Sequence, residues 1–304
     1  MKKVLFLFMF FVLFIYGCQT LIVPDTDDAV PANRFGISGL QALISIIPVQ
    51  PRVRVPISVL FEVQNVGETD FDQGTICLHG PQKEHFEFFE ECACQPLPAL
   101  EGEKTVQTQK GEKKIPGEKD TVYFKGIYVP LVQADEVLQA KLKYHYKTRA
   151  KIDACVKKEI YKRDECSWLI EGTFSRNILK SVSKGPVKVA RAYEMLADTE
   201  SGILMTYDIE VKDTERSRGK VIDRFGDYFT CREQEEGEIK VEMFNVPGLS
   251  NPLTCPPIIL DEFGEGKTRC EVILKPTQSY KEETVIELTY AYELNYGTRL
   301  IIVP

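Results

Sequence analysis

The stretch PISVLFEVQNVG, residues 56–67, alternates apolar and polar side chains with a period of two. This alternation is typical of a β-strand that buries one face, and it places Ile57 and Phe61 inside. The stretch ILMTYDIEV, residues 203–211, alternates in the same way. Its first inward residue, Ile203, follows Ile57 by 146 residues (203 − 57 = 146). The two strands are therefore candidates for equivalent positions in an internal repeat.

A second pair of strands repeats with the same spacing, which we call the repeat offset. LQAKLKYHY ends at Tyr146 and VIELTYAY ends at Tyr292, again 146 residues apart. Unrelated strands would match in pattern but would not keep one offset over two separate segments, so the sequence predicts an internal duplication. The paired tyrosines have two interpretations. They form either a tyrosine corner, in which a hydroxyl ties a loop to an immunoglobulin-like domain, or simple aromatic packing across strands.

Turns that contain glycine and proline separate short strands along the chain, and almost no segment has helical periodicity. Many short strands in each copy predict antiparallel β-sandwiches. We therefore expect an all-β protein with two tandem immunoglobulin-like antiparallel β-sandwich domains after an N-terminal lipoprotein-type signal segment. The polar insertion at residues 101–120 is expected to form a mobile hairpin or loop, with a recognition loop as the alternative.

The N-terminus has the pattern of a targeting segment, because two lysines precede an apolar run, residues 4–16, of signal-peptide length. The adjoining residues Ile15-Tyr16-Gly17-Cys18 resemble the lipobox of prokaryotic lipoproteins. This resemblance implies cleavage after Gly17 and a diacylglyceryl group on the Cys18 thiol. Two acyl chains hold a protein on a bilayer, whereas one binds only marginally. An uncleaved N-terminal anchor and an ordinary cleaved signal are the alternatives.

The predicted organisation has five parts. The two predicted domains are similar in size to an immunoglobulin-like sandwich, which has about 100 residues. The parts are a signal peptide at 1–17, a lipidated tether at 18–35, domain 1 at 36–156, a connector at 157–184 and domain 2 at 185–304.

The cysteine count supports export. Of nine cysteines, removing the lipid acceptor Cys18 leaves eight, and an even count in an exported chain predicts disulfides. We favour a local pair between Cys155 and Cys166, which leaves three cysteines in each domain and requires a bridge between the domains. The alternative assigns Cys155 to domain 1 and Cys166 to domain 2, giving four cysteines each. Cys92 and Cys94 are too far apart at Cα, as strand neighbours, to pair with each other. The eight disulfide candidates are Cys77, Cys92, Cys94, Cys155, Cys166, Cys231, Cys255 and Cys270.

One cluster has the composition of a catalytic or metal site. CLHGPQKEHFEFFEECAC, residues 77–94, combines three cysteines with His79 and His85. These residues are ligand types for zinc or copper, but their spacing fits no compact zinc module, and an oxidising location favours disulfides. The third histidine, His145, alternates with tyrosines and is expected to face solvent. Because no nucleophile elbow, phosphate loop, dinucleotide fingerprint or metalloprotease helix is recognisable, we predict no catalytic residue, no metal and no cofactor.

Three segments together resemble uncharacterised exported (lipo)proteins of archaea. They are SGLQALISIIP at 38–48, the strand that ends in Asn65-Val66-Gly67, and YHYKTRAKIDAC at 144–155. The resemblance spans most of the mature chain; it implies tandem immunoglobulin-like domains and assigns no activity. The second copy departs from the first at one turn, because Val211-Lys212-Asp213 stands where the first copy has Asn-x-Gly. That turn is expected to differ.

A net charge of −7 argues against binding to nucleic acid, whose phosphates require clustered cations. The favoured function is a non-enzymatic protein, lipid-anchored at the outer face of the cytoplasmic membrane. Its two domains would contact an envelope protein or a glycan through edge strands and end loops. One alternative is an accessory subunit of a membrane-bound secreted enzyme or transport complex. The other is a copper- or zinc-handling surface protein that uses residues 77–94.

Overall fold

The structure is a computed structural model, in which the chain is divided into a first unit, Met1–Ala32, and a second, compact unit, Asn33–Pro304. The predicted signal peptide and Cys18 lie outside the described residues. The three predicted ranges 36–156, 157–184 and 185–304 all lie in the second unit. The described residues are 33–36, 39–48, 50–79, 85–87, 92–129, 134–161, 166, 169–223, 226 and 228–303.

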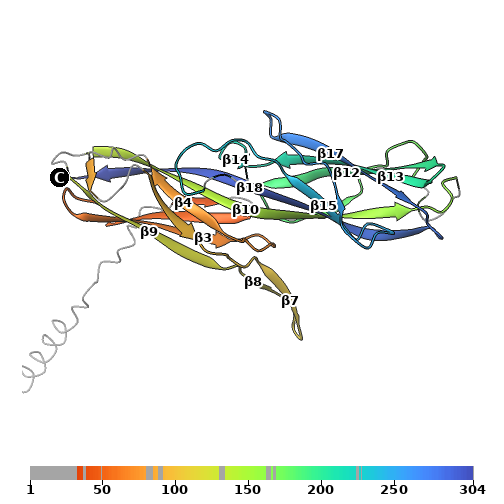
Figure 1. Ribbon diagram of the computed structural model, residues 1–304. Coiled ribbons are helices and arrows are strands. Elements are labelled where there is room, and N and C mark those ends of the chain that lie inside the picture. The colour runs from red at the N-terminus through yellow and green to blue at the C-terminus, as the bar shows by residue number, and fades with distance from the viewer. Residues whose placement is uncertain are drawn as a thin grey trace, which may run out of the picture. The chain divides into compact units, whose positions relative to one another are not determined.

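The elements of the described residues are β-strands, and the ladders between them are antiparallel, which confirms the prediction of an all-β fold (Figure 1). In this part of the chain, no helix is long and apolar enough to cross a membrane. The first sheet has the order β1 (Asn33–Gly36), β2 (Leu40–Ile47), β3 (Pro56–Asn65), β9 (Lys119–Tyr128) and β5 (Phe86–Glu87).

The central sheet has eight strands. Its main path is β16 (Leu253–Thr254), β15 (Lys240–Phe244), β18 (Tyr280–Ile302), β10 (Ala134–Val156), β4 (Gly74–His79) and β6 (Cys92–Leu97). Two further strands pair off this path, β11 (Leu179–Val182) with β10 and β14 (Gly219–Ile222) with β18.

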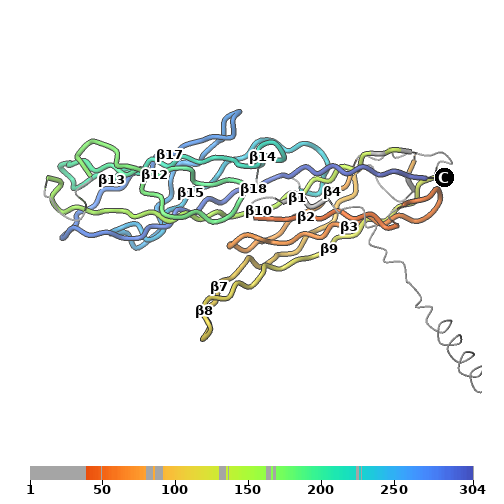
Figure 2. The backbone as a smooth tube through the Cα atoms, turned by 180° about the vertical axis from the view of Figure 1, so that it is seen from behind, coloured from red at the N-terminus to blue at the C-terminus, as the bar shows by residue number. Residues whose placement is uncertain are grey.

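A third sheet and a hairpin complete the second unit. Residues 101–120, expected to be a hairpin or a loop, contain a hairpin that projects from the sheets in both views (Figures 1 and 2). The third sheet has the order β12 (Val187–Thr199), β13 (Gly202–Asp213) and β17 (Glu265–Leu274), and the hairpin consists of β7 (Lys104–Thr108) and β8 (Gly111–Ile115).

The centre of the fold is the ladder between β10 and β18, which are 23 residues long each. They pair over their whole length, from Ala134 opposite Ile302 to Val156 opposite Tyr280. Figure 2 shows the two strands running together through the unit, as does the opposite view in Figure 1. The halves of the chain that the repeat predicts therefore share one continuous sheet.

The register of this ladder relates the two copies to each other. His145 lies opposite Ala291, which is its own equivalent at the repeat offset (291 − 145 = 146). Because an antiparallel pair reverses direction about its central residues, this register places an approximate two-fold axis at the His145–Ala291 pair. The outer sheets follow the same offset, since β9 and β17 differ by it at both ends (265 − 119 = 146 and 274 − 128 = 146). Each is third in the matching orders β2-β3-β9 and β12-β13-β17.

Four of the buried tyrosines on the inward face of the central ladder pair across it. The rings of Tyr144 and Tyr292 lie directly across the ladder with centroids 6.0 Å apart, and those of Tyr146 and Tyr290 are 6.3 Å apart. They belong to the same hydrophobic core as the inward residues of β3 and β13, such as Ile57. Aromatic packing across strands, one of the two interpretations above, is therefore present.

The hydroxyls of two of these tyrosines lie beside equivalent residues at the ends of β3 and β13. The Tyr146 hydroxyl donates to the Lys184 carbonyl oxygen at 3.3 Å and lies so close to Gly67 that a Cβ there would be 1.8 Å from it. In the second copy, the Tyr292 hydroxyl donates to a carboxylate oxygen of Asp213 at 2.9 Å. Asp213 is the equivalent of Gly67 at the repeat offset (213 − 67 = 146). At this turn, the first copy has close packing of Tyr146 against Gly67, whereas the second copy has a hydrogen bond from Tyr292 to Asp213.

The outward face of the same ladder is paired by charge, with cations on β10 and glutamates on β18. Arg149 Nε donates to Glu287 Oε2 at 2.7 Å, Lys147 Nζ lies 3.3 Å from Glu287, and Lys151 Nζ lies 2.8 Å from Glu283. Burial raises the pKa of Glu287, but Arg149 and Lys147 outweigh it and hold that pKa below its ordinary value. Opposite charges and buried tyrosines on opposite faces together specify this register.

Substituting Gly67→Ala tests the close packing of Tyr146. A Cβ at Gly67 would overlap the Tyr146 hydroxyl, so we expect the free energy of unfolding to fall by about 1–3 kcal/mol, as for overpacked cores. The matched control is Gly297→Ala on β18, where nothing lies within 4 Å of the added methyl group. Urea unfolding of both variants measures the difference. Equal free energies of unfolding for the two variants would contradict the close packing of Tyr146 against Gly67.

Candidate functional site

Four cysteines from three segments of the chain meet on the outward face of the central sheet. Cys77 on β4 lies opposite Cys94 on β6 and, on its other side, opposite Lys141 on β10. Directly opposite residues point to the same face, and Cys92, two residues before Cys94 on one strand, also points there. The fourth residue, Cys231, comes from the segment after β14.

The eight cysteines of the described residues all form disulfides. The local pair favoured from the sequence, Cys155–Cys166, is present. One bridge, Cys92–Cys231, spans 139 residues of sequence and joins the two halves of the duplication, as the count of three cysteines in each half requires. Cys92 and Cys94 are not bonded to each other. The remaining bridges are Cys77–Cys94 and Cys255–Cys270.

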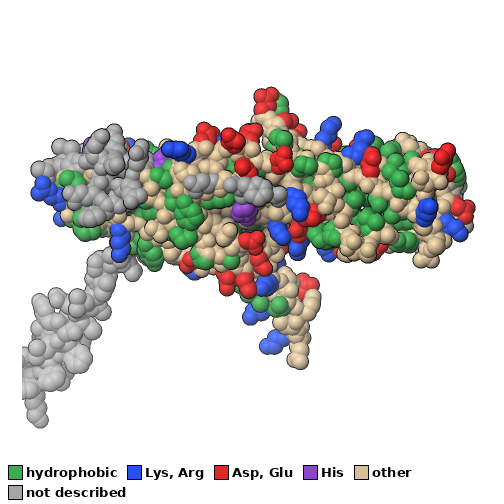
Figure 3. All heavy atoms as spheres, viewed as in Figure 1, with side chains coloured by type: hydrophobic (Ala, Val, Ile, Leu, Met, Phe, Trp, Pro, Cys, Tyr) green, Lys and Arg blue, Asp and Glu red, His purple; other side chains and the backbone are tan. Residues whose placement is uncertain are grey.

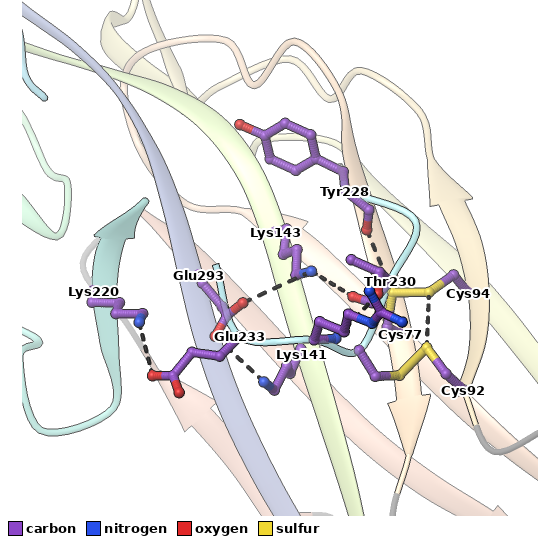
Figure 4. A network of polar contacts seen from close by, with 12 residues as sticks. Cys77, Cys92, Cys94, Lys141, Lys143, Lys220, Tyr228, Thr230, Glu233 and Glu293 are labelled. Atoms are coloured by element: carbon purple, nitrogen blue, oxygen red, sulfur yellow. Dashed lines mark hydrogen bonds and ion pairs between the residues drawn. A yellow bond between two sulfur atoms is a disulfide. The ribbon is translucent and has the colours of Figure 1, made fainter. Parts of the chain in front are cut away.

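Two of these bridges form a compact four-sulfur cluster, which we define as Cys77, Cys92, Cys94 and Cys231 (Figure 4). All four Sγ atoms lie within 4.8 Å of one another, and the Sγ atoms of Cys92 and Cys94 are 3.6 Å apart although they belong to different bridges. Cys77 is buried, and the other three are half-buried. Among the described residues, this is the group of cysteine, histidine and carboxylate side chains with the geometry to hold a metal ion.

The segment that carries Cys231 covers the outward face of β10 beside the cluster. Cys77 Sγ lies 3.5 Å from the Tyr228 carbonyl oxygen, and Cys231 Sγ lies 3.8 Å from the Leu78 carbonyl oxygen. The Lys143 ammonium donates to the Thr230 carbonyl oxygen, as Figure 4 shows. These contacts fix the covering segment to the sheet at and just before the Cys92–Cys231 bridge.

Charged side chains surround the cluster. Lys141 and Lys143 contact opposite oxygens of Glu293 at 3.8 Å and 3.9 Å, and the Lys143 and Glu293 side chains are almost entirely buried. At the edge of the network, Lys220 Nζ lies 2.9 Å from Glu233 and lowers the pKa of that exposed carboxyl group. The two lysines and Glu293 carry a net charge of +1 next to the sulfur atoms. The site is therefore mildly cationic.

None of the three histidines belongs to the four-sulfur cluster. His79 is opposite Cys92 in the ladder but is not in the four-sulfur group, and burial followed by the charge of Lys141 lowers its pKa. The His85 ring packs against Tyr128 with centroids 5.9 Å apart. His145 was expected to face solvent, and this is corrected: it is half-buried, with its ring 5.2 Å from that of Tyr228. The reason is the covering segment, which lies over the face that the strand pattern assigns to solvent.

A groove lies elsewhere, on the third sheet. It has a volume of about 630 Å³ and combines the rings of Phe174 and Tyr193 with charged groups. Arg269 donates to both carboxylate oxygens of Asp208, at 2.7 Å and 3.1 Å, and lies over the Phe174 ring at 5.6 Å. Charged side chains of both signs line the groove. Charged side chains of both signs are also spread over the face of the molecule that Figure 3 shows. The groove offers aromatic and ionic contacts together.

No protein-family model matches the chain, and no curated protein is significantly similar to it. The resemblance to exported archaeal proteins stays a prediction. The sequence named Cys231 as a disulfide candidate but did not place it beside residues 77–94, and it did not find Lys141, Lys143 or Glu293. The odd number of cysteines in each half was the only signal for Cys231, and nothing in the alternation of β10 distinguishes Lys143 from exposed lysines.

A buried carboxyl group lies beside a different bridge. Glu194 on β12 accepts the backbone N–H of Cys155 at 3.1 Å, close to the Tyr207 hydroxyl, and is inaccessible to solvent. Burial raises the pKa of Glu194 to about 8. The folded protein therefore favours the protonated carboxyl group at neutral pH.

This raised pKa predicts a loss of stability with rising pH. The contribution of Glu194 to the free energy of unfolding is fully present below its unfolded pKa of 4.5. It is lost as the pH rises through about 8, and the loss is at most about 1.4 kcal/mol per pH unit. We expect Glu194→Gln to remove this part of the pH dependence between pH 5 and pH 8.5, measured by urea unfolding. The control Glu271→Gln, on an exposed position of β17, should keep the wild-type dependence. Identical pH profiles for wild type and Glu194→Gln would contradict the shift.

The bridge between the halves should stabilise more than a local bridge. Entropic models give about 3 kcal/mol for a 15-residue loop and about 4.7 kcal/mol for a 100-residue loop. We therefore expect the double variant Cys92→Ser/Cys231→Ser to lose more stability than Cys255→Ser/Cys270→Ser, whose cysteines are 15 residues apart. Urea unfolding without reductant compares the two. The reverse order would show that native contacts, not chain entropy, determine the effect of the Cys92–Cys231 bridge.

Proposed function

We propose that this chain is a non-catalytic, lipid-anchored protein of the outer face of the cytoplasmic membrane. Its duplicated β-structure is presented to envelope proteins or glycans. The observation that carries this proposal is the complete pairing of the eight cysteines beyond Cys18. Stable disulfides of this number are typical of proteins outside the reducing cytosol.

The immunoglobulin-like assignment is part of this proposal. It is supported by the matching three-strand orders β2-β3-β9 and β12-β13-β17 in the two copies. It is also supported by the tyrosine hydroxyls of Tyr146, close to Gly67, and Tyr292, bonded to Asp213, at equivalent turns. In this interpretation the copies correspond to the predicted domains at 36–156 and 185–304. Their antiparallel ladder and the Cys92–Cys231 bridge would fix the angle between them.

A rigid support suits a binding function, because the surfaces that contact a partner lose little freedom on association. The groove beside Phe174 and Arg269 is one such surface, since it pairs aromatic rings with charged groups. A second is the exposed β7–β8 hairpin, whose residues all lie at the surface. Cys18 would attach this arrangement to the membrane through its acyl chains.

Mass spectrometry of the protein from native membranes tests the proposal. We expect the N-terminal fragment to begin at Cys18 with a diacylglyceryl group, to lack residues 1–17, and the intact chain to contain no alkylatable thiol before reduction. The control Cys18→Ser should retain residues 1–17, because lipidation precedes cleavage in the lipoproteins that the lipobox resembles. An unmodified Cys18 in protein recovered from the cytosol, with free thiols elsewhere, would exclude this function.

A further inference from the structure

We propose that the reduced chain binds one Zn²⁺ ion through the four-sulfur cluster of Cys77, Cys92, Cys94 and Cys231. This inference goes beyond the proposed function and does not depend on the lipid anchor. It concerns the same chain before its cysteines are oxidised, or after they are reduced. The site would link the two halves with a metal where the oxidised chain links them with a disulfide.

The positions of the sulfur atoms fit tetrahedral coordination. A Zn–S bond of about 2.3 Å gives a tetrahedron with edges of about 3.8 Å. The Sγ atoms of Cys92 and Cys94 are already 3.6 Å apart, and all four lie within 4.8 Å of one another. The two edges that are now disulfides must open to about 3.8 Å, so that each sulfur moves by about 1 Å. Side-chain rotation alone supplies a movement of this size.

The backbone places three of the four ligands on paired strands. Cys77 lies opposite Cys94, and Cys92 projects from the same face of β6. The fourth ligand, Cys231, lies on the segment that Lys143 fixes to the sheet through the Thr230 carbonyl oxygen. A site built on strands is preorganised, because the fold and not the metal determines where the ligands lie.

The ligand type and the surrounding charge agree with zinc. Four thiolates are a soft ligand set that selects Zn²⁺ over hard cations such as Mg²⁺ or Ca²⁺. A zinc ion with four thiolates has a net charge of −2, which the lysines beside the cluster partly offset. Lys141 lies opposite Cys77 in the ladder, and Lys143 lies two residues further along β10. Their shared partner Glu293 leaves one positive charge in excess.

The change between the two forms balances as a reduction followed by an exchange of protons for metal. Each of the two disulfides takes two electrons and two protons from a dithiol reductant, which becomes a cyclic disulfide. The S–S bonds Cys77–Cys94 and Cys92–Cys231 break, and four thiols form. Zn²⁺ then displaces four protons as four Zn–S bonds form. In the reverse direction, two molecules of a disulfide oxidant take four electrons from the thiolates and four protons from solvent and become thiols, while the two S–S bonds form again and Zn²⁺ is released.

The test uses the full chain, kept in mild detergent, reduced with a dithiol and freed of reductant under anaerobic conditions. Zn²⁺ is added in competition with a chromogenic chelator, and Co²⁺ is used as a spectroscopic probe of sulfur coordination. We expect one Zn²⁺ per chain, release of about four protons per ion, and protection of the four cluster cysteines from alkylation. Cys77→Ser and Cys231→Ser should each weaken binding at least tenfold. The matched controls Cys155→Ser/Cys166→Ser and Cys255→Ser/Cys270→Ser should bind as the wild type does.

The test remains decisive if the reduced chain unfolds. If the reduced wild type loses its β-structure, Zn²⁺ should restore the circular dichroism of the wild type and both controls, but not of Cys77→Ser. Absence of stoichiometric binding by the wild type would overturn the proposal. Binding that is unchanged in Cys77→Ser and Cys231→Ser would also overturn it, because the metal would then lie elsewhere.

Discussion

The structure depends on one ladder, in which β10 and β18 pair over their entire length. The two strands occupy equivalent positions in the two copies and lie next to each other in the sheet, so this pairing joins two cores into one sheet. It also brings the two-fold axis of the duplication to the His145–Ala291 pair. A shift of one residue would turn every side chain of one strand to the wrong face. The buried tyrosines would then face solvent, and the outward cations would lie in the core.

The outward face of this ladder determines where chemistry is possible. Toward Val156, cations of β10 face Glu287 and Glu283 of β18, and the exposed Lys151–Glu283 pair contributes little to stability. Near the middle, the segment that carries Tyr228 and Cys231 covers the sheet and buries Lys143 with Glu293. Covering a charged face requires partners for the charges and a firm attachment. The Cys92–Cys231 bridge supplies that attachment, and it places four sulfurs together.

The two proposals thus come from one arrangement. In the oxidised chain, the bridge fixes the halves relative to each other, which suits a protein that presents binding surfaces outside the cell. In the reduced chain, the same four sulfurs are arranged for a tetrahedral metal. Disulfides and zinc both demand sulfurs within a few ångströms on a firm backbone. A fold that satisfies the first demand for two adjacent bridges therefore comes close to satisfying the second.

The sequence by itself determined the strands, their buried faces and the duplication, because alternation and a constant repeat offset are properties of the chain read along its length. Ile57, Ile203 and the four tyrosines are buried as that alternation predicts. With Cys155 and Cys166 paired locally, the count of cysteines also required a bridge between the halves. Only the tertiary structure decided which cysteines meet, that His145 and Lys143 are covered, and that β10 pairs with β18. These features depend on contacts between residues that are far apart in sequence. The alternation of residues along one strand does not predict which distant segment will cover that strand.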